Sequence, residues 1–248
     1  MAELVKFARE QNIALFARGG GMSYTKAFQP ILARAISLDF SRLNRIREIN
    51  VEDGHVTAEV GVTWQALDAA LAPHGVRARW WGPQSGGVAT LGGSLSQGSI
   101  TFGSGRVGAS ANTVKSFEIV SGTGEIIRTG SDGCTGTGPF NRAFGPELTG
   151  LFAQDAGALG IKTAVTLEIE PRPALVSGLS FAFDDFDAMT SLLSFVTHRR
   201  LASEIIAMDA EVARQNAGPP DLLGDVKAMW RIGAAAGNPL SALGRMAR

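Results

Sequence analysis

The spacing of apolar residues in the first quarter of the chain predicts one helix and several short strands. Over residues 2–11 the apolar positions recur at helical spacing. Short apolar runs predict strands over 13–17 and 35–40. Over 45–61, apolar and polar residues alternate around an Asp-Gly dipeptide, which is typical of a β-hairpin turn. We therefore expect sheet and turn to dominate this part of the chain.

Further along, helix and strand patterns continue to alternate. Thr63 is placed to cap the N-terminus of a helix that ends near Gly75. Residues 114–130 predict a second hairpin and residues 147–152 a short helix. Apolar and polar residues alternate over 161–169, as they do in a strand with one buried face.

A domain boundary is expected where two prolines end this strand. Pro171 and Pro173 interrupt the pattern, so residues 1–173 and 174–248 are expected to form separate domains. Beyond the boundary the pattern predicts three elements, namely a strand near 179–183, a helix over 186–196 and a second short strand over 205–208.

The composition is that of a globular protein without a polyanionic partner. The chain has 248 residues, of which 45% are hydrophobic and 19% charged. Lys and Arg number 23, as do Asp and Glu, so the net charge does not favour nucleic acid or an anionic membrane. No apolar run approaches the roughly 20 residues that span a bilayer, and the N-terminus lacks a signal-peptide core, so we expect a cytoplasmic protein. With one cysteine and no Cys/His cluster, no metal site is expected.

The chain has 31 glycines, and two segments are especially rich in them, of which residues 18–25 are the first. Three consecutive glycines directly follow a predicted strand there. Such a turn leaves several backbone N–H groups free to bind phosphate. A tight turn without a ligand explains this segment equally well, so the segment alone does not decide between the two.

The second glycine-rich segment, residues 82–108, is too long for a simple connector. Its small residues alternate with Ser and Thr, which supply donors without bulk and suit a flat or elongated ligand. Residues 103–108 also match the G-x-G-x-x-G pattern of dinucleotide-binding folds. That pattern needs a strand before it and a helix after it, whereas here a loop precedes it and a strand follows, so we reject a Rossmann fold.

The order of these motifs resembles the FAD-binding domain of the FAD-linked oxidases. The segments are RGGGMSYT, GVTWQAL, GPQSGGVATLGGSLSQGS, FEIVSGTGEIIRTG and ELTGLFAQDAGALGIKTAVTLEIEP, within roughly residues 2–171. The family includes vanillyl-alcohol oxidase, p-cresol methylhydroxylase (PCMH), D-lactate and glycolate dehydrogenases, and cytokinin dehydrogenase. The resemblance implies an α+β, PCMH-type fold in which two α/β subdomains hold extended FAD between them.

The resemblance also implies which residues contact FAD. In this family the RGGG loop holds the pyrophosphate, and the long Gly/Ser/Thr segment follows the ribityl chain, the diphosphate and the flavin ring. The GALGIKT segment is similar to the family pattern GxLGI(I/V)T, which lies near the adenine. By position, cofactor contacts are expected at Arg18, Gly19, Gly20, Gly21, Met22, Ser23, Ser85, Gly87, Thr90, Gly93, Ser94, Ser96, Gly160 and Ile161.

Met22 departs from the family pattern. Relatives that tether FAD covalently often have His immediately before the loop serine, and a methionine thioether cannot form the histidyl bond. We therefore expect FAD to bind without a covalent link through this loop.

Residues 174–248 resemble only the opening of the family's substrate, or cap, domain, which would be an incomplete α+β domain. We therefore expect a chain truncated at its C-terminal end, without the strand that precedes the first helix in relatives. Because unpaired strand edges favour association, a homo-oligomer is a further expectation.

The resemblance implies an FAD-dependent oxidoreductase. A hydride would move from a CH–OH carbon of a small-molecule substrate, an alcohol or hydroxy acid, to flavin N5. The substrate-side groups of relatives lie mostly on the cap domain, so no catalytic residue is assigned. Two alternatives stay open, a non-catalytic domain that binds FAD, a nucleotide or a partner chain, and a reductase of the UDP-N-acetylenolpyruvoylglucosamine reductase type.

Overall fold

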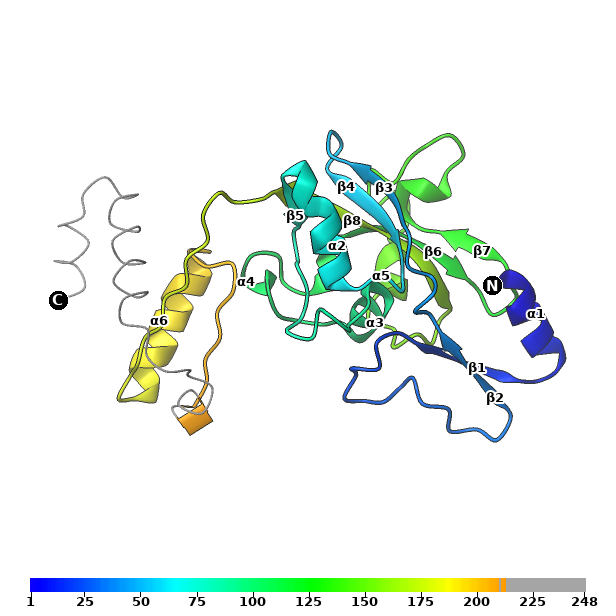
Figure 1. The fold of residues 1–248 in the computed structure, drawn as a ribbon, viewed down its shortest axis with the longest axis horizontal. Coiled ribbons are helices and arrows are strands. Elements are labelled where there is room, and N and C mark those ends of the chain that lie inside the picture. Colours follow the sequence, from blue (N-terminus) through cyan, green and yellow to red (C-terminus); the bar gives the residue numbers. More distant parts are fainter. Residues whose placement is uncertain (210, 213–248) are drawn as a thin grey trace. The chain divides into compact units, whose positions relative to one another are not determined.

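The computed structural model describes residues 1–209 and 211–212 (Figure 1). The chain forms two compact units. The first comprises Met1–Arg172 with Thr197–Glu204, and the second contains Pro173–Val196 and, of the described residues, 205–209 and 211–212. The roles expected for residues 1–173 and 174–248 stay predictions.

A six-stranded sheet forms the centre of the first unit (Figure 1). Its pairings are all antiparallel, and the β3–β4 and β6–β7 pairs are the two expected hairpins. Gly54 and Gly124 turn these hairpins with φ of +67° and +84°, a conformation that favours glycine. The strands lie in the order β3 (Ile46–Asn50), β4 (His55–Glu59), β8 (Ile161–Pro171), β6 (Val114–Val120) and β7 (Ile126–Arg128), and β5 (Val76–Ala78) also pairs with β8.

β8 is a central strand, and the prediction that only one of its faces is buried is wrong. It pairs with β4 on one side and β6 on the other, and residues 162–167 are all buried. A strand covered on both faces must satisfy its polar side chains internally. Lys162 pairs with Asp155, and the Thr166 hydroxyl hydrogen-bonds that of Thr57 at 2.9 Å.

A smaller parallel sheet is formed by β1 (Ala14–Arg18) and β2 (Ala35–Asp39). Helix α1 (Ala2–Glu10) precedes it, buries Val5 and Ala8, and matches the helix expected over 2–11. A small apolar cluster of Leu38, Phe40 and Val60 joins this sheet to the end of β4. Two sheets, each with helices, confirm the predicted α+β class.

The main core lies between the large sheet and three helices, α2 (Trp64–Leu71), α3 (Leu91–Gln97) and α5 (Leu148–Phe152). As expected, the Thr63 hydroxyl caps α2 and accepts a hydrogen bond from the Ala66 amide at 3.2 Å. The following 3₁₀ turn, η1 (Ala72–His74), ends at Gly75 with φ of +68°. Trp64 and Trp80 pack edge to face with ring centroids 4.6 Å apart.

The second glycine-rich segment is not one continuous loop, because α3 forms inside it. The Thr90 hydroxyl caps this helix, and Leu91 and Leu95, one turn apart, are fully buried. The sequence did not predict this helix, because glycines are poor helix formers and several of them surround these two leucines. The G-x-G-x-x-G residues form only a short helix, α4 (Ser104–Val107), followed by 3₁₀ turn η2 (Ser110–Thr113) and β6, which agrees with the rejection of a Rossmann fold. A further 3₁₀ turn, η3 (Gly130–Gly133), follows β7.

After residue 172 one of the three expected elements forms. Helix α6 (Phe186–His198) matches the helix expected over 186–196. The strands expected near 179–183 and over 205–208 are wrong, because no strand forms at these described residues and none there has a pairing partner. No helix within the described residues is long and apolar enough to cross a membrane.

Candidate cofactor site

Both glycine-rich segments line one cavity of about 580 Å³ in the first unit. This volume lies within the range of roughly 300–1,000 Å³ usual for small-molecule sites. Of the residues expected to contact FAD, those that line the cavity are Gly19, Gly20, Gly21, Met22, Ser23, Ser85, Thr90, Gly93, Ser94, Ser96 and Gly160.

The two segments touch through glycines that leave no space for a side chain. A Cβ added to Gly19 would lie 2.2 Å from Thr90 Oγ1, and one added to Gly20 would lie 2.1 Å from the Val88 carbonyl oxygen. Both distances are far shorter than any real contact. The close approach therefore requires glycine at these two positions.

Helix α3 holds the second segment in place through the core. The Gly92 amide donates to the Val60 carbonyl at 2.9 Å, which docks the helix on the chain that leaves β4. The Thr90 hydroxyl accepts from the Gly93 amide at 3.3 Å, and the Ser94 hydroxyl accepts from the buried Trp64 indole at 2.8 Å. The hydroxyl groups on this side of the cavity thus belong to a rigid element.

A polar contact that the sequence did not predict also joins the two segments. Gln97 Oε1 accepts hydrogen bonds from the Ser23 hydroxyl at 3.0 Å and the Thr25 hydroxyl at 3.1 Å. All three residues line the cavity. No local motif could have identified Gln97, because its partners lie more than 70 positions away.

Lys162 is a second cavity residue that sequence reasoning missed. Its ammonium lies 2.6 Å from Asp155 Oδ1, and both side chains are almost fully buried. Burial lowers the pKa of Lys162 below its ordinary value, although the hydrogen bond and charge of Asp155 oppose this effect. The sequence does contain a signal for this residue. In the segment GALGIKT, Lys162 stands where the family pattern GxLGI(I/V)T has Ile or Val.

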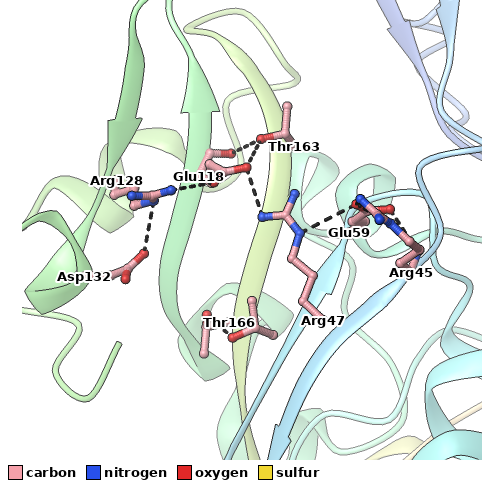
Figure 2. Close-up of polar contacts among 9 residues, drawn as sticks. Arg45, Arg47, Glu59, Glu118, Arg128, Asp132, Thr163 and Thr166 are labelled. Carbon is pink, nitrogen blue, oxygen red and sulfur yellow. Dashed lines mark hydrogen bonds and ion pairs between the residues drawn. The ribbon is translucent and has the colours of Figure 1, made fainter. Parts of the chain in front are cut away.

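A row of charged and polar side chains crosses the large sheet (Figure 2), and none of these side chains lines the cavity. Two of its members are sequence neighbours of the cavity residues Val60 and Lys162. Strand by strand the row contains Arg47 on β3, Glu59 on β4, Thr163 on β8, Glu118 on β6 and Arg128 on β7.

Glu59 is the most buried carboxylate of this row. Burial alone would raise its pKa, but hydrogen bonds from Arg45 and the charges of Arg45 and Arg47 hold the pKa below its ordinary value. Burial likewise acts to raise the pKa of Glu118, and a hydrogen bond from Thr163 and the charge of Arg47 outweigh it. Both carboxylates are therefore kept ionised and paired.

Three of the expected contact residues do not line the cavity. The Arg18 guanidinium lies 5.8 Å from the centroid of the Phe28 ring. A Cβ on Gly87 would lie 3.0 Å from Gln65 Oε1, and Ile161 packs against the Leu38, Phe40 and Val60 cluster. Contact between the expected residues and FAD stays a prediction.

The residues of the cavity fit an elongated, anionic nucleotide cofactor. The lining combines closely packed glycine backbone with Ser and Thr hydroxyls, and among its described residues Lys162 is a cation while Asp and Glu are absent. Because the Lys162 ammonium is already paired with Asp155, such a site can hydrogen-bond phosphate oxygens through its amides and hydroxyls without presenting an opposing negative charge. Within the described part of the chain, no His, Cys, Asp or Glu side chains are grouped to hold a metal ion.

A family model and several curated proteins resemble this chain in sequence. A profile described as "FAD binding domain" matches residues 1–130, just over half of the chain. An uncharacterized FAD-linked oxidoreductase of Mycobacterium tuberculosis is 27% identical over 91% of this chain and 49% of its own length. A glycolate oxidase subunit of Bacillus subtilis is 25% identical over 87% of this chain and 43% of its own length. The chain spans about half the length of the curated relatives it matches.

The fold is also found in solved structures. A structure of alkyldihydroxyacetonephosphate synthase superposes with a TM-score of 0.60 and 23% identity, over 70% of this chain and 30% of that one. This likeness supports the expected PCMH-type fold and says nothing about the reaction. Together with the profile match and the cavity, it leads to one conclusion: the chain belongs to the FAD binding domain family, and its cofactor is FAD.

Proposed function

We propose that this chain supplies the cofactor-binding part of an FAD-dependent oxidoreductase that takes a hydride from a CH–OH carbon of an alcohol or hydroxy acid. The observation that carries the proposal is the contact of the two glycine segments, at Gly19 and Gly20, around a cavity without carboxylates. The names of the M. tuberculosis and B. subtilis relatives support this reaction class. When bound, FAD supplies the hydride acceptor, flavin N5.

The proposal gives the residues of this chain binding and orienting roles. The amides of Gly19, Gly20 and Gly21 would face the diphosphate, and the hydroxyls of α3 would hold the rest of the cofactor. Residues 1–173 would form the FAD-binding domain and residues 174–248 the beginning of the substrate domain. No residue of either part is assigned as a base, since the substrate-side groups of relatives lie mostly on the substrate domain and residues 174–248 resemble only its opening.

The visible absorption spectrum tests this proposal. The chain is purified, incubated with FAD and freed of excess cofactor, and glycolate, D-lactate and a simple primary alcohol are then added without oxygen. We expect flavin bands that bleach with at least one of the three, because a two-electron transfer removes the oxidised flavin absorption. Free FAD with the same additions is the control.

Each other outcome has a definite meaning. Protein-bound flavin that none of the compounds bleaches would contradict oxidoreductase activity of this chain and favour a non-catalytic FAD-binding domain. Protein without flavin bands, even after incubation with FAD, would contradict the cofactor role of the cavity itself.

A further inference from the structure

The cavity wall between α5 and β8 has an unusual backbone. Gln154, Ala156 and Gly157 all have left-handed φ angles, of +59°, +53° and +82°. Left-handed conformations cost free energy for residues with a side chain, so two of these three positions are strained. Ala156, Gly157 and the nearby Gly160 line the cavity. We define residues 154–157 as the wall loop.

Two backbone hydrogen bonds tie the wall loop to α3. The Gln154 amide donates to the Leu95 carbonyl at 2.9 Å, and the Ala156 amide donates to the Ser96 carbonyl at 2.8 Å. The loop therefore lies directly against the helix that presents Ser94 and Ser96 to the cavity. The residues that follow Ala156 are held by other contacts.

The Asp155 carboxylate supplies those contacts. Its Oδ1 accepts from the Gly157 amide at 2.9 Å, and its Oδ2 accepts from the Leu159 amide at 3.3 Å. Lys162 Nζ donates to the same Oδ1 at 2.6 Å, from the central strand β8. One buried carboxylate thus joins the left-handed turn to the central strand of the sheet.

Each charge of this pair depends on the other. The exposed fractions of the Asp155 and Lys162 side chains are 1% and 3%, so water does not solvate either group. Within the described part of the chain, Lys162 is the only cation within 4.0 Å of the Asp155 carboxylate. The ammonium also lies 5.7 Å from the centroid of the Phe117 ring. This ring is apolar and can interact with a cation only through its π-electrons. Removing one partner would leave the other charge buried and uncompensated.

We propose that Asp155 and Lys162 are positioning residues for FAD, and that their ion pair fixes the wall loop in the conformation that shapes the cofactor cavity. Without the pair, the uncompensated charge would be hydrated by opening of the loop. Ala156 and Gly157 would then move away from the cavity. The inference rests on FAD as the cofactor and adds a determinant of its affinity that lies outside the glycine segments.

The dissociation constant of FAD, measured by quenching of flavin fluorescence on the full chain, tests this proposal. The set contains the wild type, Lys162→Met, Asp155→Asn and the double variant, with apo-protein thermal unfolding measured in parallel. We expect Lys162→Met to raise the dissociation constant roughly tenfold or more, because it leaves a buried, unpaired carboxylate. The double variant should recover much of the affinity, since neither charge is then left alone.

Lys115→Met is the matched control. Lys115 Nζ lies 3.9 Å from Glu168 Oε1, so this pair links β6 to β8, and neither of its residues lines the cavity. We expect Lys115→Met to lower the unfolding temperature without changing the dissociation constant. A pair that only stabilised the fold would give the same pattern for Lys162→Met.

Three results would overturn the proposal in distinguishable ways. Equal FAD affinity of the wild type and Lys162→Met would reject the positioning role and leave FAD binding intact. Failure of the wild type to bind FAD would reject the cofactor assignment as well. If Lys162→Met does not fold, Asp155→Asn decides, because unchanged affinity in this variant would also reject the role.

Discussion

At the scale of single residues, the cavity depends on the absence of a side chain at Gly19 and Gly20. Their Cα atoms sit against Thr90 and the Val88 carbonyl, where a methyl group would overlap existing atoms. The neighbouring atom at Gly20 is backbone, which cannot rotate away as a side chain can. Substitution here must push the two glycine segments apart.

Gly20→Ala is expected to weaken FAD binding strongly. The added Cβ would lie 2.1 Å from the Val88 oxygen, so the segments separate and the cavity changes shape. We expect a dissociation constant raised by about tenfold or more, equivalent to about 1.4 kcal/mol, in a fluorescence titration. Gly122→Ala is the control, because nothing lies within 4 Å of its added Cβ. Equal affinity of the two variants would contradict the prediction.

Met22 leads to a prediction about attachment of the cofactor. Its side chain lines the cavity and is half exposed, yet its thioether cannot form a histidyl bond to flavin. Acid precipitation of the FAD-loaded protein should therefore release all flavin into the supernatant and leave a colourless pellet. A yellow pellet after repeated washing would reject this expectation.

At the scale of secondary-structure elements, the row of side chains in Figure 2 ties five strands together. Arg47 lies between Glu59 and Glu118, with nitrogen–oxygen distances of 3.6 Å and 3.1 Å. Strands far apart in sequence are thus joined by charge as well as by backbone hydrogen bonds. Exposed ion pairs contribute little to stability, but Glu59 is buried and its partners are close.

The pairing of Glu59 should make stability depend on pH. Because its pKa is lower in the folded than in the unfolded chain, Glu59 stabilises the fold above the ordinary value of 4.5. This contribution declines as the pH falls below 4.5 and through the folded-state pKa. Urea unfolding at pH 7 should show Glu59→Gln less stable than the wild type by on the order of 1 kcal/mol. The difference should shrink as the pH approaches 3, and a constant difference would contradict the assignment.

At the scale of the whole molecule, the cavity collects segments that are distant along the chain, from Ala17 to Lys162. A ligand that contacts both the loop after β1 and helix α3 binds only when these elements are folded together. Such a ligand stabilises the folded state by mass action.

FAD should therefore raise the unfolding temperature. At a concentration 100 times the dissociation constant the gain is about 2.7 kcal/mol, which for a domain of this size corresponds to roughly 5–10 °C. Differential scanning calorimetry with and without FAD measures the shift, and Gly20→Ala at the same FAD concentration should show a smaller one. An unchanged unfolding temperature of the wild type would contradict cofactor binding in this cavity.

The sequence by itself determined the elements whose signals are local. The two hairpins, α1, the cap at Thr63 and α6 were predictable, because each depends on residues a few positions apart. The five motifs in their order, the two glycine segments among them, also sufficed to identify the resemblance to the family and to predict FAD. The wall loop, by contrast, was not expected, since left-handed Gln154 and Ala156 carry no local signal.

Only the tertiary structure decided how these parts meet. It placed β8 in mid-sheet with both faces buried, formed α3 within the second glycine segment, and brought Gln97 to Ser23. It also paired Lys162, which lies in the predicted strand entry GALGIKT, with Asp155 just before that segment. The reason is physical: burial and pairing depend on neighbours in space, and packing of the whole chain selects those neighbours.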